Sequence, residues 1–471
     1  MKAYLVWLSV FIWSLPLYAG SQAEPAFIQM FNQGKRAQII QYLSDNMAKS
    51  QLDTYGLDAQ VDMFLGDQAT YGKLTFVKTL PDADGNDVFE VISGNNQFTY
   101  NLTINKEPQE PHKINYFEFL SAGSVDQAKT PVSATEFAQQ LSGFINKVAS
   151  HDAFSGAVLV AKDKEVIFKG AVGFADRRWK VKNTVDTRFS LASMNKMFTA
   201  IAALQLIEQG KLTFDDKLIQ FVDKSWLPMK HAEAITIRHL LTHTSGLGNF
   251  FNDAFIQSNK EIYRDLAGYK PLIAKSELLF TPGSQNRYSN SGMLMLGLVI
   301  EKVSGESYYD YIQKHIYDKA KMPGSGSFEL DSTTENIASG YLKRMHSDDW
   351  VDSVYTREIK GSPAGGGFST IDDLYQFSLA LTEFKLLGKA LTEQAYSAKT
   401  EFNSAPWYGY GFAVGGKPDN RIVGHSGAYL GVDSRLDIHL DKGFVVVILA
   451  NQSGVVGPMR RKINELIALY Q

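Results

Sequence analysis

One short segment of the chain reads Phe189-Ser190-Leu191-Ala192-Ser193-Met194-Asn195-Lys196-Met197-Phe198, with a serine and a lysine three residues apart. Apolar residues then recur at helical spacing as far as Gly210, a residue typical of a helix C-terminus. The pattern therefore predicts a helix that begins near this segment. On its surface Ser193 and Lys196 lie on one face, so the lysine amine reaches the serine hydroxyl.

This pairing of side chains suits nucleophilic catalysis. A serine hydroxyl is a poor nucleophile until an adjacent base takes its proton. A lysine that is desolvated at a buried helix start has a lowered pKa and can be that base. The free N–H groups of the helix start also favour developing negative charge. Because short Ser/Lys spacings arise by chance, the rest of the chain has to support the assignment.

Composition narrows the classes of protein to consider. The 471 residues are 44% hydrophobic and 21% charged, which indicates a globular protein long enough for two or more domains. The net charge of −3 and the absence of a basic run predict no nucleic-acid partner. The chain has no cysteine, which excludes disulfides, thiolate catalysis and cysteine metal sites.

The first residues are predicted to direct export. Lys2 precedes an uncharged run over residues 3–19, and Ser21-Gln22-Ala23 supplies small residues for cleavage. This layout predicts a secretory signal peptide over residues 1–23 and a periplasmic or secreted protein. Retention of the run as an anchor is the alternative. No later segment is predicted to span a membrane.

Residues 24–121 predict a small α+β domain. Two short helical patterns come first, followed by alternating segments with turns at residues 84–87 and 94–96. No catalytic constellation occurs here. The order of elements resembles the small domain of the nuclear-transport-factor type.

Residues 122–132 predict a linker, and residues 133–471 a larger domain. Ser133-Ala134-Thr135-Glu136 is a capping box that begins a helix. A hairpin pattern follows it, and a second hairpin and a helix close the chain. The two ends are therefore expected to build one sheet, with a mostly helical part inserted between them.

Three further segments of this domain carry candidate functional groups. Residues 287–292, Arg-Tyr-Ser-Asn-Ser-Gly, precede an apolar helix and place Tyr288 at its start. Residues 424–428, Gly-His-Ser-Gly-Ala, predict a strand edge that a substrate can approach. Residues 364–370, Ala-Gly-Gly-Gly-Phe-Ser-Thr, predict unusual backbone dihedrals before a capped helix.

Together these motifs resemble the serine β-lactamase and penicillin-binding-protein superfamily, in its class C and esterase branch. The resemblance covers residues 133–471 and includes the flanking segments Leu241-Thr242-His243-Thr244-Ser245-Gly246-Leu247 and Tyr408-Gly409-Tyr410-Gly411-Phe412. It implies a β-lactamase/transpeptidase-like α+β fold, with an antiparallel sheet flanked by helices, preceded by the small α+β domain.

The resemblance also implies roles for individual residues. Ser193 matches the acylated nucleophile and Lys196 its base. Tyr288 matches the tyrosine that carries the proton to the leaving group. Asn290 matches the residue that orients Lys196 and the substrate amide. The backbone N–H groups of Ser193 and Ala428 match the oxyanion hole.

The substrate-binding motif departs from the family's Lys-Thr-Gly pattern, because it reads His425-Ser426-Gly427. A lysine is cationic at neutral pH and holds a substrate carboxylate, whereas a histidine with an ordinary pKa is mostly neutral. The departure favours an ester or amide without an anchoring carboxylate. We also expect acidification toward about pH 6 to raise the protonated fraction of His425.

The resulting functional hypothesis is an exported serine hydrolase that acts through a Ser193 acyl-enzyme on small esters or amides, without metal or cofactor. The substrate is a small molecule or a peptide. One alternative is a class C-like β-lactamase or a D-alanyl-D-alanine carboxypeptidase or D-aminopeptidase. The other is an acyl-binding or sensor protein without turnover.

Two other enzyme classes fit the sequence less well. Residues 424–428 nearly match the nucleophile motif Gly-x-Ser-x-Gly of the α/β-hydrolases, but Ala428 stands where the second glycine is required. That fold also needs an acid and then a histidine after the serine, and His439 is the one histidine that follows Ser426 in the sequence. A zinc hydrolase could use His239 and His243, but Leu240 occupies the place of the required glutamate.

Overall fold

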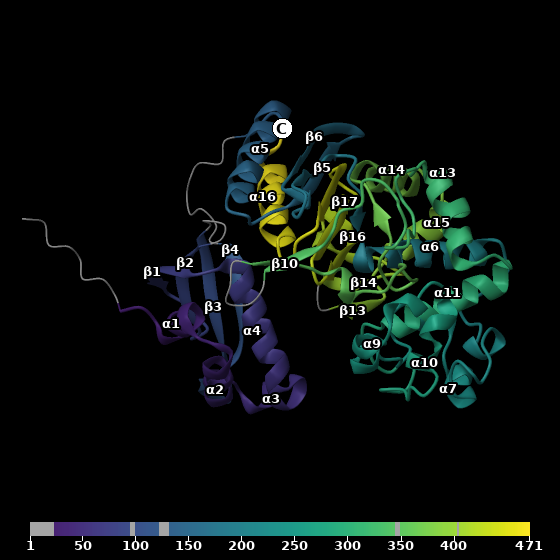
Figure 1. The fold of residues 1–471 in the computed structure, drawn as a ribbon, viewed down its shortest axis with the longest axis horizontal. Helices are drawn as coiled ribbons and strands as arrows, with labels where there is room; N and C mark the ends of the chain where they lie inside the picture. The colour runs from purple at the N-terminus through teal and green to yellow at the C-terminus, as the bar shows by residue number, and fades with distance from the viewer. Residues whose placement is uncertain (1–22, 95–98, 122–130, 344–348, 403–404) are drawn as a thin grey trace, which may run out of the picture. The chain divides into compact units, whose positions relative to one another are not determined.

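The computed structural model describes residues 23–94, 99–121, 131–343, 349–402 and 405–471 (Figure 1). Almost all of the predicted signal peptide and linker lies outside these residues. Residue contacts divide the chain into two compact units, the first made of most residues between 23 and 121 and the second containing residues 131–471. Within the described residues, none of the helices has the length and apolar character needed to cross a membrane.

The N-terminal region consists of four helices followed by a four-stranded antiparallel meander, as the order of patterns predicts. Rings of Phe27, Phe31, Phe64 and Phe117 pack against one another between helices and sheet. The sequence predicts only the first two helices. The elements are α1 (Ala26–Gln33), α2 (Arg36–Asn46), α3 (Lys49–Tyr55), α4 (Leu57–Tyr71), β1 (Leu74–Leu80), β2 (Asp87–Ser93), β3 (Thr99–Glu107) and β4 (Glu110–Ser121).

The second unit is built on an eight-stranded antiparallel sheet in the order β13-β14-β15-β16-β17-β18-β5-β6. Strand β18 pairs with β5, which confirms that the two ends of the unit share one sheet. The strands are β5 (Gly156–Lys162), β6 (Glu165–Val172), β13 (Thr400–Phe402), β14 (Ala405–Tyr408), β15 (Ala413–Lys417), β16 (Asn420–Tyr429), β17 (Val432–His439) and β18 (Phe444–Ala450).

Three short strand pairs lie outside this sheet. One of them joins the nucleophile segment to the glycine-rich segment that precedes α14. The pairs are β7 (Phe174–Asp176) with β8 (Val181–Lys182), β9 (Phe189–Ser190) with β12 (Phe368–Ser369), and β10 (Tyr341–Lys343) with β11 (Trp350–Asp352).

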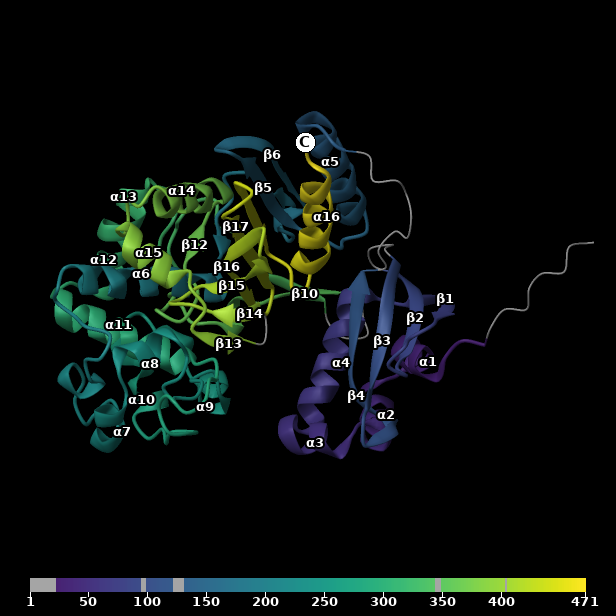
Figure 2. The same cartoon turned by 180° about the vertical axis from the view of Figure 1, so that it is seen from behind.

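The two terminal helices of the second unit, α5 (Ala134–Ser150) and α16 (Val456–Leu469), pack side by side on the sheet (Figures 1 and 2). The predicted capping box is confirmed, because Ser133 Oγ accepts from the backbone N–H of Glu136 and the Glu136 side chain accepts from that of Ser133. Val132, just before it, pairs with the C-terminal end: its N–H donates to Leu469 O at 2.9 Å.

The helical part surrounds α6 (Asn195–Glu208), which is buried over most of its circumference and is therefore a core helix. It packs against α11 (Asn290–Ser304). The remaining helices are α7 (Met229–Ala234), α8 (Ile237–Leu241), α9 (Asp253–Gln257), α10 (Lys270–Ile273), α12 (Tyr308–Ile312), α13 (Asp318–Ala320), α14 (Ile371–Thr382) and α15 (Lys389–Ala395). The predicted fold class, an antiparallel sheet flanked by helices, is confirmed.

Candidate active site

The predicted nucleophile lies in a tight turn between β9 and α6. Ser193 is the middle residue of a 3₁₀ turn, η1 (Ala192–Met194), and Ala192 before it has a positive φ of 45°. This conformation costs about 1–3 kcal/mol for a residue with a side chain. Two backbone hydrogen bonds hold it, from Gly366 N to Ala192 O at 3.1 Å and from Leu191 N to Gly367 O at 3.0 Å.

Lys196 lies directly behind this serine. Its side chain is fully buried, and its Nζ lies 3.0 Å from Ser193 Oγ. The same amine contacts the carbonyl oxygen of Ala364. Burial lowers the pKa of Lys196 well below its ordinary value. The lowered pKa of Lys196 and its distance from Ser193 Oγ together allow the amine to accept the serine proton.

The first turns of α6 also fix the loop before β12, through three consecutive carbonyl groups. Asn195 Nδ2 donates to Ser362 O at 2.6 Å, and Thr199 Oγ1 donates to Pro363 O at 2.8 Å. The contact of Lys196 with the next carbonyl completes the series. The glycines that follow have the predicted unusual dihedrals, with φ of 81° and 71° at residues 366 and 367.

Tyr288 reaches the same hydroxyl from the start of α11. A side-chain hydrogen bond with Ser193 lowers the pKa of Tyr288, but burial outweighs it, so that the pKa is raised overall. The Nζ of Lys196 lies 4.6 Å from the centre of the tyrosine ring. Ser193 is therefore contacted by both an amine and a phenol.

His243 holds Tyr288 in place. Its carbonyl oxygen accepts from Arg287 N at 2.9 Å, and its Nδ1 accepts from Ser289 N at 3.3 Å. The imidazole ring lies 4.5 Å from the ring of Tyr288. His243 therefore binds the backbone on both sides of the tyrosine, a role that its sequence position did not reveal.

Strand β16 passes close to the nucleophile turn at Gly427. A Cβ on this residue would lie 2.0 Å from Leu191 O, so only glycine allows the approach. Ser434 on the neighbouring strand donates its hydroxyl to Leu191 O at 3.0 Å and so fixes the same carbonyl. The next residue, Ala428, consequently lines one small pocket together with Ser193.

The structure places the other predicted substrate-binding residues on α11 and β16. Asn290 is the first residue of α11, and its Nδ2 donates to Asn249 Oδ1 at 2.9 Å. Ser426 is opposite Arg435 on β17. His425 is buried, with Nε2 at 3.2 Å from Tyr408 Oη and Nδ1 at 2.5 Å from Ser426 O.

The environment of His425 corrects one expectation. Burial is the main reason that the pKa of His425 falls to about 3, and the charge of Lys196 adds to the effect. Acidification toward about pH 6 therefore does not protonate this residue, contrary to the expectation from an ordinary histidine.

Comparison with known proteins identifies the family of this chain. A family model described as Beta-lactamase matches residues 141–470. The chain belongs to this beta-lactamase family. Penicillin-binding protein 4* of Bacillus subtilis (strain 168) is 31% identical over 323 residues, which span 64% of this chain and 68% of that protein. The chain is accordingly a serine hydrolase of the β-lactamase and penicillin-binding-protein superfamily.

Solved structures of the superfamily have the same fold. A penicillin-binding protein from Bacillus halodurans superimposes with a TM-score of 0.63 and 31% identity, covering 68% of this chain and 98% of that one. A D-amino acid amidase from Ochrobactrum anthropi SV3 has a TM-score of 0.62 and 19% identity, covering 71% and 98%. The second likeness shows the fold alone.

This beta-lactamase family member has two charged residues in its pocket that the motifs did not reveal. Arg357 and Glu358 line it with Ser193, and both are more than nine-tenths buried. Burial raises the pKa of Glu358 to about 7, although Arg357 and Lys196 lower it. The Nε of Arg357 has no hydrogen-bond partner within the described residues. The only sequence signal was an adjacent charged pair ahead of the glycine-rich segment.

The histidines of the zinc alternative both bind backbone groups. His239 Nδ1 accepts from Thr236 N at 3.2 Å at the start of α8, and His243 packs on Tyr288 as described. Within the described ranges, no group of three or more metal-ligating side chains is assembled.

Proposed function

We propose that this chain is an exported serine hydrolase that forms a Ser193 acyl-enzyme on small esters or amides. The observation that carries the proposal is the 3.0 Å approach of the Lys196 amine to the Ser193 hydroxyl. Because the pKa of that buried lysine is lowered, the amine is deprotonated more readily than a surface lysine.

The proposed reaction has two halves. The serine oxygen attacks the substrate carbonyl while its proton passes to the Lys196 amine, and the N–H groups of Ser193 and Ala428 stabilise the oxyanion. Tyr288 then transfers its proton to the leaving group, which departs as an alcohol or amine, and Tyr288 takes the proton that Lys196 had accepted from Ser193. Water then attacks the acyl-enzyme and gives up a proton to Tyr288 and Lys196. As the Ser193–acyl bond breaks, that proton returns to the Ser193 oxygen, and the carboxylic acid is released.

The environment of His425 supports a substrate that lacks an anchoring carboxylate. Its two ring nitrogens contact protein groups, and its lowered pKa keeps the ring uncharged at neutral pH. The lysine that would hold a carboxylate in the family's Lys-Thr-Gly motif has no charged counterpart here.

Arg357 favours a second candidate, the hydrolysis of substrates that carry a carboxylate, such as β-lactams or peptides with D-alanine ends. Its guanidinium is buried beside Ser193, and guanidinium groups recognise carboxylates with paired hydrogen bonds. Relatives named penicillin-binding proteins agree with such a substrate. Glu358 would in turn favour an amino group on the same substrate.

Covalent labelling tests the nucleophile. A fluorophosphonate probe is expected to add its mass to the Ser193 peptide in wild type, and Ser193→Ala is expected to remain unlabelled. Ser190→Ala is the matched control, because Ser190 lines the same pocket and lacks the lysine contact. Labelling that persists in Ser193→Ala would refute the assignment.

Kinetics then separate an enzyme from an acyl-binding protein. A panel of neutral esters, cephalosporins and D-amino-acid peptides is expected to show continued turnover, best on neutral esters. Release that stops at one equivalent of leaving group would identify the protein without turnover. Export is tested by N-terminal sequencing from the native host, where a chain beginning near Glu24 is expected.

A further inference from the structure

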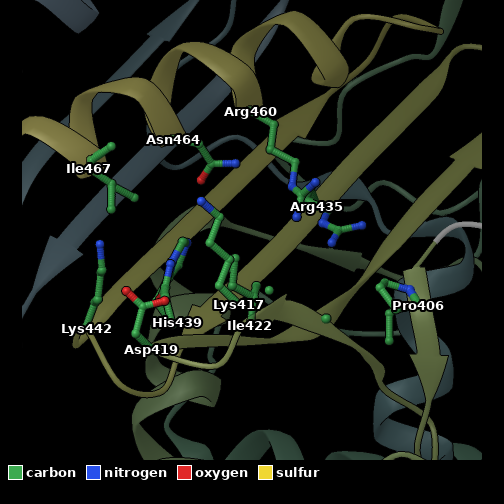
Figure 3. Close-up of a pocket in the computed structure, with 15 residues that line it drawn as sticks. Pro406, Lys417, Asp419, Ile422, Arg435, His439, Lys442, Arg460, Asn464 and Ile467 are labelled. Atoms are coloured by element: carbon green, nitrogen blue, oxygen red, sulfur yellow. The ribbon is translucent and has the colours of Figure 1, made fainter. Parts of the chain in front are cut away.

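A second cavity, separate from the catalytic pocket, lies between α16 and the strands β15, β16 and β17. Its volume is about 510 Å³, within the range of small-molecule sites. Figure 3 shows the side chains that line it. Ile422 on β16 lines it, whereas His425 on the same strand faces Tyr408. The two residues are an odd number apart and therefore point to opposite faces of the sheet.

The cavity walls are rich in basic side chains. Alternate residues of β17 supply Arg435 and His439, and the facing side of α16 supplies Arg460. Lys417 at the end of β15 and Lys442 after β17 complete the set, and Figure 3 shows these side chains around one space.

Few acidic groups balance these charges. Asp437 is buried and accepts from Arg435 Nε at 2.7 Å and from Arg460 Nε at 2.5 Å, so two guanidinium groups share one carboxylate. Asp419 is the one carboxylate among the lining residues. In the described part of the chain, neither Lys417 nor Lys442 forms an ion pair with it.

His439 contributes a buried ring nitrogen that lacks a hydrogen-bond partner in the described residues. Its Nδ1 lies 3.2 Å from Asn420 Oδ1, an oxygen that only accepts, so Nδ1 carries the proton. Burial lowers the pKa of His439 to about 4, which keeps the ring neutral. Its buried Nε2 is an acceptor without a partner in the described residues, and such atoms normally have one.

We propose that this cavity is a binding site for the phosphate ester of a small hydroxylated molecule. A phosphate offers three acceptor oxygens and up to two charges, which suits several cationic donors better than a carboxylate does. A hydroxyl group on the ligand would donate to His439. The apolar side chains of Ile422 and Ile467 would cover the carbon skeleton.

Calorimetry on the full chain with glycerol 3-phosphate tests this proposal. Binding is expected in wild type and is expected to weaken by about tenfold or more in Lys417→Gln/Lys442→Gln, because two charge-assisted contacts are lost. The matched control is Lys385→Gln/Lys389→Gln, which removes the same charge from exposed lysines outside the cavity. Equal labelling of Ser193 by fluorophosphonate verifies that each variant is folded.

Further arms identify the ligand's source and the hydroxyl contact. Vesicles containing phosphatidylglycerol are compared with soluble glycerol 3-phosphate, and binding to either one, with the same loss in the cavity variant, supports the site. His439→Leu is expected to abolish the preference for glycerol 3-phosphate over inorganic phosphate. Absence of binding in both arms, or equal affinity of the cavity and control variants, would overturn the proposal.

Discussion

At the scale of single residues, the charge of Glu358 influences the pKa of Lys196, the proposed base. Its carboxylate raises the pKa of Lys196, against the larger effect of burial. We therefore expect Glu358→Gln to lower the pKa of Lys196 further and to move the acidic limb of the pH profile of kcat/KM down by up to about one unit. Glu261→Gln, an exposed change on a nearby 3₁₀ turn, is the control. An unchanged or upward shift would show that the two groups are not coupled.

His425 carries the prediction about substrate choice. Because the pKa of its imidazole is about 3, His425 is expected to leave the ratio of kcat/KM for cephalosporins to that for neutral esters unchanged between about pH 5 and pH 8. The test uses the Glu358→Gln background, since the pKa of Glu358 in the same pocket is about 7. His425→Lys is expected to raise this ratio about tenfold to a hundredfold, since a charge contact is worth about 1.5–3 kcal/mol. Steady-state kinetics on both substrates measure it, and a wild-type preference for cephalosporins would contradict the prediction.

At the scale of elements, the loop before β12 sets the position of the catalytic amine. Gly366 has a φ of 81°, and a Cβ there would lie 2.7 Å from Gly361 Cα and 3.3 Å from Glu358 Oε1. Gly366→Ala is thus expected to combine backbone strain of about 1–2 kcal/mol with a steric clash. Both kcat and the free energy of unfolding are expected to fall.

Gly210, which follows the core helix α6, provides a matched control for Gly366. Gly210 has a φ of 69°, and a Cβ there would meet open space. Gly210→Ala is therefore expected to show the strain alone, without loss of kcat. If both variants lose the same stability and keep full activity, the loop does not position Lys196.

At the scale of the whole molecule, the residues of the proposed site all belong to the second unit. A chain of residues 131–471 is expected to fold and to acylate at a rate within about tenfold of the full chain. It begins at Pro131 because Val132 forms backbone hydrogen bonds with Leu469 and Gln471. Stopped-flow acylation measures the rate, and a folded chain that loses more than about a hundredfold, or ~2.7 kcal/mol, would show that the first region completes the site.

Buried neutral histidines make stability depend on pH. The pKa of His439 is about 4 in the folded protein, so between that value and about 6.5 the unfolded chain binds the extra proton and stability falls on acidification. At pH 5 the loss is about 2 kcal/mol for one such group. The pKa values of Glu358 and Asp433 are raised in the folded protein, so these two groups increase the free energy of unfolding on acidification.

The measurable quantity is therefore a difference between two proteins. His439→Gln is expected to make the free energy of unfolding fall less steeply than that of wild type between about pH 7 and pH 5. Urea denaturation at each pH measures the slope. An equally steep fall in the wild-type protein and the variant would contradict the prediction.

The sequence by itself determined the core helix, the capping box at Ser133, the hairpins and the order of the motifs. These depend on residues close together in the chain, because helical periodicity, caps and turns are local properties. It also led to the family, since Ser193, Lys196 and Tyr288 stand in recognisable segments. The α+β fold followed from strand patterns at both ends of the larger domain.

Only the tertiary structure decided what surrounds those groups. Lys196 contacts the carbonyl oxygen of Ala364, which is distant in the chain. The charged pair at residues 357–358 lines the pocket of Ser193, and the second cavity is formed by β15, β16, β17 and α16. Each of these features brings together segments that are far apart in the sequence. The pKa of His425 was misjudged for the same reason. Burial and neighbouring charges are set by the packing of distant elements, and neither residue type nor spacing encodes them.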